Sequence, residues 1–173
     1  MEEIVVGIDV GTTKICALVG RVEEDNPIRI MGVGIEPSDG IRKGIIVDLA
    51  AATQAIARSV KKAESTSGLE ITSALVSIAG AHVASVNSRG ASAVNGKVIE
   101  QYDLNHAMEQ ARAVAIPNDR EIIHVIQRGF SVDGQDGIRS PRGMHGYRLE
   151  VEAHIITASA ATVDNLRHCV SAS

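Results

Sequence analysis

Five residues near the N-terminus are of the types that hold nucleotide phosphates and a metal ion: Asp9, Gly11, Thr12, Thr13 and Lys14. A glycine lets the backbone approach an anion without a Cβ in the way, so consecutive N–H groups can point at the same oxygens. The threonine hydroxyls add donors and the lysine adds a positive charge. The pattern therefore predicts a cofactor-binding turn that holds phosphates.

Asp9 extends this prediction to a metal. It ends an apolar strand, where an unpaired carboxylate is costly to desolvate, and Mg²⁺ or its waters would offset that cost. A simpler interpretation stays open, in which residues 10–13 form an ordinary hairpin turn, Asp9 caps its own backbone and Lys14 is solvated. The chain contains no G-x-x-x-x-G-K-[ST] loop. The Gly32-Val-Gly34 segment is not a dinucleotide fingerprint either, because it is followed by Pro37 and not by a third glycine and a helix.

The turn needs two strands to position it. Residues 4–10 and 15–22 are apolar on both faces, which is typical of central strands. The composition of Glu23–Pro27 predicts a turn. Residues 28–35 predict a third strand, whose two glycines mark a bulge or a close backbone approach. We therefore expect a three-stranded meander, followed by a loop.

A helix is predicted to follow Asp48, which is a good N-cap. Apolar residues then recur at helical spacing until Ser67-Gly68 stops the helix; they are Leu49, Ala52, Ile56, Val60 and Ala63. Residues 71–78 predict a further strand. The helix is therefore a crossover that returns the chain to the sheet.

A boundary is expected at Gly80–Val83, since the next segment has its own pattern. We predict a small α+β unit with a three-stranded sheet and two helices. Its expected elements are strands 84–88 and 91–94 around a hairpin or bulge at Arg89-Gly90, a helix capped by Asp103 and ended at Pro117, strand 121–132, loop 134–146, strand 147–157 and a last helix with Val163, Leu166 and Val170.

Strand 147–157 alternates clearly. Leu149, Val151, Ala153 and Ile155 are predicted to face the core, and Arg148, Glu150, Glu152 and His154 the opposite side. The polar face with Arg148, Glu150 and Glu152, and the loop Arg139–Gly143, are candidates for contact with other proteins. A solvated face is the alternative interpretation.

Composition excludes several classes of function. The chain has 173 residues, of which 45% are hydrophobic and 22% charged, as in soluble globular proteins. With 2% aromatic residues and a net charge of −4, nucleic acid is not an expected partner. Cys16 and Cys169 do not suggest a disulfide scaffold, and no histidine has a second ligand at metal spacing. Without a signal peptide or a membrane span, we expect a cytoplasmic protein.

Several motifs together resemble the FtsA family of bacterial cell-division proteins, within the actin-like superfamily. They run in order along the whole chain: Gly7–Lys14, Gly32–Ser38, Gly40–Gly44 with Asp48-Leu49, His124–Gln127 and His154–Thr157. The resemblance implies an α/β fold, an incomplete actin-like (ribonuclease-H-like) domain with an inserted small α+β domain. It assigns residues 1–82 to the first part of domain 1A, and residues 83–173 to the inserted domain 1C with a helix that leads back to 1A.

The resemblance also implies a function. It predicts the N-terminal portion of an adaptor that binds ATP and Mg²⁺, forms filaments through the inserted domain, and ties the FtsZ ring to the inner face of the membrane. FtsZ and other division proteins are the implied partners, and membrane contact would be made only by a C-terminal helix outside this chain. Phosphates are expected against Gly11–Lys14, with Asp9 reaching Mg²⁺ through water.

At most weak ATPase activity is expected, and we predict no catalytic residue. Two other functions remain open: a small-molecule kinase of the same superfamily, and a protein-interaction module that needs no nucleotide. A kinase would need a catalytic carboxylate and a substrate pocket, for which the chain offers no candidate.

Overall fold

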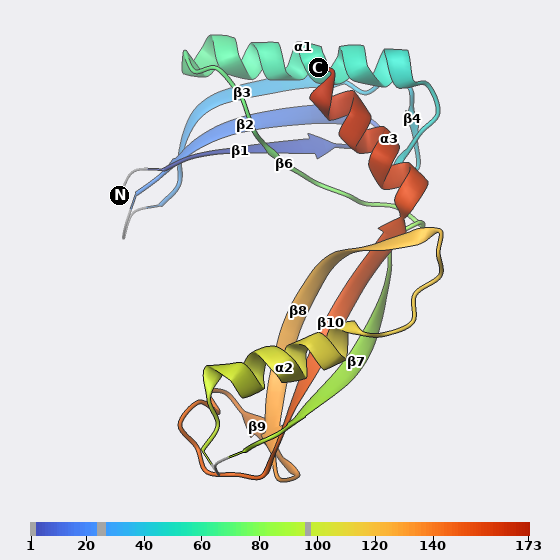
Figure 1. Ribbon diagram of the computed structural model, residues 1–173. Helices are drawn as coiled ribbons and strands as arrows, with labels where there is room; N and C mark the ends of the chain where they lie inside the picture. The colour runs from blue at the N-terminus through green and yellow to red at the C-terminus, as the bar shows by residue number, and fades with distance from the viewer. Residues whose placement is uncertain (1–2, 24–26, 96–97) are drawn as a thin grey trace. The chain divides into compact units, whose positions relative to one another are not determined.

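The computed structural model describes residues 3–23, 27–95 and 98–173 (Figure 1). The chain divides into two compact units, Met1–Val83 with Ala161–Ser173, and Ala84–Ala160. Each unit has a hydrophobic core of its own. The turn predicted at Glu23–Pro27 contains Glu24–Asn26, which lie outside the described residues.

The first unit contains a four-stranded sheet in the order β3-β2-β1-β6. Its strands are β1 (Glu3–Val10), β2 (Lys14–Val22), β3 (Arg29–Pro37) and β6 (Leu75–Val76). The first three strands pair antiparallel, and β6 pairs parallel to β1. The predicted meander with a crossover back to the sheet is therefore confirmed, although β6 is much shorter than the expected strand at 71–78.

Helix α1 (Leu49–Ser67) is the crossover, and it covers one face of this sheet (Figure 1). As predicted, Asp48 is its N-cap and accepts a hydrogen bond from the backbone N–H of Ala51 at 3.0 Å. Gly68 ends the helix in the left-handed conformation, with φ of 73°. The apolar stripe of the helix supplies Ala52, Ala55, Ile56 and Ala63 to the core.

Helix and sheet touch backbone to backbone at β3. A Cβ added to Gly34 would lie 1.8 Å from the carbonyl oxygen of Ser59. The buried Ser59 hydroxyl donates a hydrogen bond to the Gly34 carbonyl oxygen at 2.8 Å. The expected close approach at the glycines of this strand is therefore confirmed, and the pairing of β2 with β3 also shifts register next to Gly32.

An ion-pair cluster closes the same interface. Glu36 is a buried residue, only 8% exposed, and its carboxylate pairs with Lys62 and, at 3.2 Å, with Arg58. The hydrogen bond from Lys62 lowers the pKa of Glu36 below its ordinary value of 4.5, and Arg58 lowers this pKa further, against the opposing effect of burial. Folding therefore favours the ionised form of Glu36.

A two-stranded hairpin follows β3 where only a loop was expected. It pairs β4 (Ile41–Arg42) with β5 (Ile45–Ile46). The two residues that join these strands, Lys43 and Gly44, have φ of 50° and 77°. Positive φ at both central positions fits a type I′ turn, which favours short hairpins.

The second unit has a four-stranded antiparallel sheet in the order β7-β10-β8-β9, not the predicted three-stranded sheet. Its strands are β7 (Ala84–Ala93), β8 (Arg120–Val132), β9 (Gln135–Ile138) and β10 (Arg148–Ser159). The extra strand β9 lies within the expected loop at 134–146. Asp133 and Gly134, with φ of 49° and 85°, form the two-residue turn that pairs it with β8.

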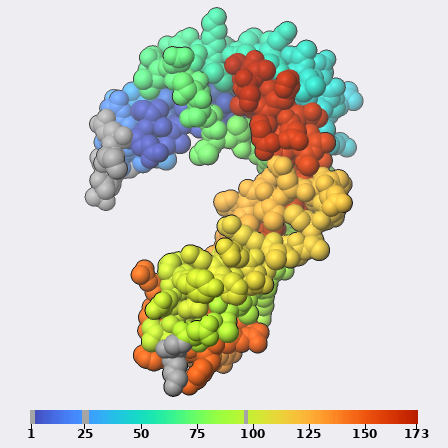
Figure 2. Space-filling view, viewed as in Figure 1, coloured from blue at the N-terminus to red at the C-terminus, as the bar shows by residue number. Residues whose placement is uncertain are grey.

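The prediction of a hairpin or bulge at Arg89-Gly90 is also wrong, because β7 is one continuous strand. Gly90 is not part of a turn; it allows a helix to pack closely against the strand. A Cβ at this position would lie 2.0 Å from the carbonyl oxygen of Ala107 in helix α2 (Gln101–Arg112). The helix therefore rests directly on the strand, and in Figure 2 its yellow-green atoms lie at the surface of this unit.

Helix α2 begins one turn earlier than predicted. Its N-cap is Glu100, and the buried Asp103 is the third helical residue, whose carboxylate accepts a hydrogen bond from the Glu100 N–H at 2.9 Å. This is the reciprocal half of a capping box. Asp103 therefore stabilises the start of the helix, but as its third residue and not as the predicted N-cap. Helix α3 (Ala160–Ser171) is the predicted last helix.

The alternation predicted for β10 is confirmed. Residues Leu149, Val151, Ala153 and Ile155 are buried under α2, with exposed fractions of 1% or less. Arg148, Glu150, Glu152 and His154 are partly or fully exposed. This sheet therefore has one packed face and one polar face.

Substitution of Gly34 by alanine should destabilise the chain by about 3 kcal/mol, the upper part of the usual range for overpacking, because the new methyl group meets the backbone of α1. Gly7→Ala is the matched control, since a Cβ at Gly7 has nothing within 4 Å. It should change stability by less than about 1 kcal/mol. Urea unfolding followed by circular dichroism measures both, and equal effects would contradict the packing described here.

Substitution of Glu36 by glutamine should destabilise the chain more near neutral pH than in acid. Because the pKa of Glu36 is lowered in the folded state, its stabilisation is complete above pH 4.5 and is lost as the pH falls through the folded-state pKa. Urea unfolding at about pH 7 and about pH 3 measures the difference. Glu70→Gln, at an exposed carboxylate, is the control, and an equal loss for Glu36→Gln at both pH values would contradict the ion-pair cluster.

Candidate functional site

Asp9 lies at the end of β1 and is exposed. Its carboxylate accepts a hydrogen bond of 2.5 Å from the hydroxyl of Ser77, which follows β6. The sequence argument that Asp9 is desolvated is therefore wrong, because water reaches this carboxylate. Because Asp9 is exposed, its carboxylate is accessible to a hydrated cation.

Gly11 closes the turn between β1 and β2. Its N–H donates a hydrogen bond to the carbonyl oxygen of Lys14 at 3.1 Å. A Cβ on Gly11 would lie 2.8 Å from that same oxygen, so only glycine fits the turn as it stands. The Gly11 N–H therefore closes the turn and, contrary to the prediction, does not face an anion. Of the backbone N–H groups of the turn, only those that follow Gly11 could contact an anion.

Thr12, Thr13 and Lys14 are all exposed on this turn. Two contacts hold the turn from other parts of the first unit. The Thr12 hydroxyl oxygen accepts a hydrogen bond from the Gly44 N–H at 3.3 Å, and the Thr13 carbonyl oxygen accepts one from the Ser38 N–H at 3.0 Å. A fixed turn with exposed hydroxyl and ammonium groups suits binding of an anion.

There is little enclosed space beside the turn. The cavity beside it, lined in part by Val10, Gly44 and Ser77, has a volume of about 10 Å³. That is room for about one water molecule. Phosphates would therefore contact the turn from solvent.

Asp9 is the carboxylate nearest in sequence to this turn, and no group of three or more His, Cys, Asp or Glu side chains in residues 3–23, 27–95 and 98–173 is arranged to hold a metal ion. Mg²⁺ commonly binds through one or two carboxylates, several waters and substrate phosphates. A single exposed aspartate beside a turn whose groups could bind phosphate fits this donor set. It does not fit a metal held by protein ligands alone.

Three residues of the site were missed by the sequence analysis, namely Ser38, Gly44 and Ser77. Ser77 could have been found, because β1 and β6 are parallel and the residues that follow parallel strands meet at one edge of a sheet. The Lys43-Gly44 pair is a recognisable two-residue turn. Nothing in the sequence near Ser38 marks its bond to Thr13.

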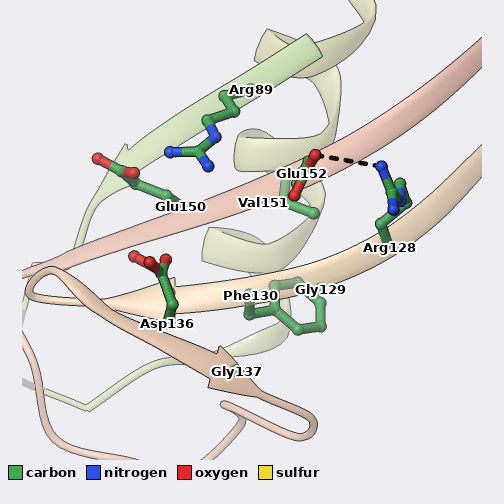
Figure 3. A pocket seen from close by; sticks show the side chains of 10 residues that line it. Arg89, Arg128, Gly129, Phe130, Asp136, Gly137, Glu150, Val151 and Glu152 are labelled. Carbon is green, nitrogen blue, oxygen red and sulfur yellow. Dashed lines mark ion pairs between the residues drawn. The ribbon is translucent and has the colours of Figure 1, made fainter. Parts of the chain in front are cut away.

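The surfaces predicted to contact other proteins lie in the second unit. On β10, Glu150 pairs with Arg148 at 2.7 Å, and Glu152 pairs with Arg128 of β8 at 3.5 Å. Of these residues, Arg128, Glu150 and Glu152 help to line a cavity of about 350 Å³ on the polar face of the sheet (Figure 3). In the loop Arg139–Gly143, both arginines are exposed and Pro141 is buried, so the loop is anchored at its centre.

The fold is that of an incomplete actin-like domain with an inserted α+β unit, as expected. A chain of the solved PilM–PilN type IV pilus biogenesis complex matches 97% of this chain and 44% of its own length, with a TM-score of 0.59 and 12% sequence identity. The model of the SHS2 domain inserted in FtsA matches residues 80–157.

The chain belongs to the FtsA family, which confirms the resemblance seen in the sequence. Several relatives bear the name cell division protein FtsA. That of Borreliella burgdorferi is 45% identical over 98% of this chain and 42% of its own length. The corresponding values are 38%, 97% and 40% for Pseudomonas aeruginosa and 31%, 95% and 39% for Escherichia coli K12. The chain thus spans about two fifths of these relatives, and its family supports a role in cell division.

Substitution of Gly11 by alanine should open the turn without unfolding the sheet, because the methyl group would collide with the Lys14 carbonyl group. We expect faster amide exchange at position 11 and shifted amide resonances from Thr12 to Lys14. Two-dimensional NMR measures both, with Gly129→Ala as the control because a Cβ there meets nothing within 4 Å. Unchanged exchange at position 11 would contradict the geometry of the turn.

Proposed function

We propose that this chain is the N-terminal portion of an ATP-binding adaptor that polymerises and tethers the FtsZ ring to the inner membrane. The observation that carries the nucleotide part is the closed turn at Gly11, which presents Thr12, Thr13 and Lys14 to solvent beside the exposed Asp9. The division role rests on membership of the FtsA family. Nucleotide binding would control polymerisation more than it would drive chemistry, with at most weak ATP hydrolysis.

In this proposal the cofactor is ATP with Mg²⁺. The amides and hydroxyls of Thr12 and Thr13 donate hydrogen bonds to the phosphates, and Lys14 adds a positive charge. Asp9 orients waters of the metal, with its carboxylate held by Ser77. When bound, the metal would neutralise part of the triphosphate charge.

The two units would have different tasks. We assign the first unit to the beginning of domain 1A and the second unit to the inserted domain 1C, with α3 leading the chain back to 1A. Self-association into filaments would use the inserted domain, and the partners would be FtsZ and other division proteins. Among the described residues, no helix has both the length and the apolar character needed to span a bilayer. Membrane contact at the division site is assigned to a C-terminal helix outside this chain.

The chain by itself should bind ATP no better than about millimolar. Charge-assisted hydrogen bonds are worth ~1.5–3 kcal/mol each, and they must first offset roughly 4–15 kcal/mol of lost ligand freedom. A longer form of the protein that supplies the rest of the nucleotide site should bind more tightly. Isothermal titration calorimetry of both forms measures this, and micromolar affinity of the 173-residue chain would contradict the proposal of a half-site.

In the longer form, Asp9→Ala should reduce the Mg²⁺-dependent part of ATP affinity, and Lys14→Ala should reduce affinity with or without the metal. Each loss is expected to be about tenfold, the equivalent of one charged contact. Asp136→Ala and Lys61→Ala remove the same charges at exposed positions that are not part of the turn, and they should have no effect. Unchanged affinity in both site variants would place the nucleotide elsewhere.

A further inference from the structure

Strand β7 is a long, open edge of the sheet in the second unit. It pairs with β10 over ten residues, from Ala84 to Ala93, without a register shift. No other strand in the described part of the chain pairs with it, because it stands first in the order β7-β10-β8-β9. It contains neither a proline nor a bulge, which are two of the features that commonly protect such edges.

The direction of its backbone groups follows from one hydrogen bond. The Val94 N–H donates to the Tyr147 carbonyl oxygen at 2.9 Å, so Val94 faces β10. Backbone groups alternate along an antiparallel strand, so the even-numbered residues of β7 face β10 and the odd-numbered residues face outward. The outward N–H and C=O groups are those of Ser85, Asn87, Arg89, Ala91 and Ala93.

Side chains leave this edge accessible. Ser85, Asn87, Arg89 and Ala93 are exposed, and most side chains of the strand are small. The opposite edge of the sheet differs, because β9 has only four residues. The edge strand β3 of the first unit differs too, since it ends in Pro37. Among the described strands, β7 is therefore the best template for an added strand.

The charge of Arg89 indicates what kind of strand fits. Arg89 lies directly across from Glu152 on β10, but Glu152 pairs with Arg128, and the next carboxylate along the strand, Glu150, pairs with Arg148. Figure 3 shows Arg89 on β7, beside the ion pair of Glu152 with Arg128. Arg89 itself forms no ion pair within the residues that the structure describes. A carboxylate on a strand added next to β7 could form an ion pair with Arg89.

A second copy of this chain fits this edge less well. Outward residues must lie opposite outward residues, so the two antiparallel registers of largest overlap, nine residues each, are centred on Ser88 and on Arg89. The first places Arg89 opposite Asn87, which offers no carboxylate, and the second places the two guanidinium groups directly opposite each other. Like charges at directly opposed positions destabilise a sheet. The edge therefore favours a different, acidic strand over self-pairing.

We propose that the outer edge of β7 binds an extended, acidic segment of a partner protein by β-strand addition. The backbone of the segment pairs with the odd-numbered residues of β7, and an Asp or Glu of the segment pairs with Arg89. This site lies within the second unit and does not depend on nucleotide binding at the turn in the first unit.

Amide exchange in the 173-residue chain tests whether the edge is open. The N–H groups of Ser85, Asn87, Arg89, Ala91 and Ala93 should exchange fast, and those of Ser88, Gly90 and Ser92 slowly, at every protein concentration. Slow exchange of the outward set in dilute protein would show a covered edge and overturn the proposal. Protection that grows with protein concentration would show pairing between copies and would also overturn it.

A displayed library of random peptides, each long enough to cover β7, tests the ligand. Recovered peptides should be rich in β-branched residues and carry an Asp or Glu, and binding should protect the outward amides of β7. Arg89→Glu and Ala91→Pro should each weaken binding at least about tenfold. A proline at an outward position spares the bonds to β10, and Ala93→Pro is a second such variant if Ala91→Pro unfolds the unit.

Arg112→Glu is the matched control, because it makes the same charge change at an exposed position of the second unit, on helix α2 and not on the sheet edge. It should leave peptide affinity unchanged. Failure to recover any peptide, or recovery of peptides that are insensitive to the β7 variants, would overturn the proposal.

Discussion

The backbone contact between α1 and β3 is the constraint on which the first unit depends. Glycine at position 34 lets the helix approach until the Ser59 hydroxyl donates a hydrogen bond to the strand, and Glu36 completes the interface with two cations. The helix can then cover β2 and β3 closely, and residues such as Ile15 and Ile56 become fully buried. Because β2 is fixed in this way, the turn that joins it to β1 has a defined position at the edge of the sheet.

Much of this architecture could be predicted from the sequence. The apolar strands around the turn, the helix that starts at Asp48 and the alternation of β10 follow from periodicity and capping, which are local signals. The two hairpins that were missed share one signature, a two-residue turn in Lys43-Gly44 and Asp133-Gly134 with positive φ at both positions. Gly90 was misread because its role depends on a distant contact and not on a local turn signal. It packs against Ala107, in a helix seventeen residues further along the chain.

The candidate site shows the same division between local and distant signals. Asp9 and the residues from Gly11 to Lys14 could be singled out from their types and spacing. The bonds that hold them come from Ser38, Gly44 and Ser77, and the exposure of Asp9 follows from tertiary structure. Sequence reasoning therefore identified the groups that could bind phosphate, but it misjudged the solvation of the carboxylate and the use of the Gly11 N–H.

The central claim is that this turn is a contact surface for the phosphates and metal of a nucleotide. Amide resonances of the 173-residue chain, followed while Mg²⁺-ATP is added to about 10 mM and then traces of Mn²⁺, test it directly at the weak affinity expected of a half-site. The claim predicts the largest shifts between Asp9 and Lys14, smaller shifts at Gly44 and Ser77, and Mn²⁺ broadening centred on Asp9. Unchanged resonances in this segment, or shifts and broadening centred on the second unit, would contradict it.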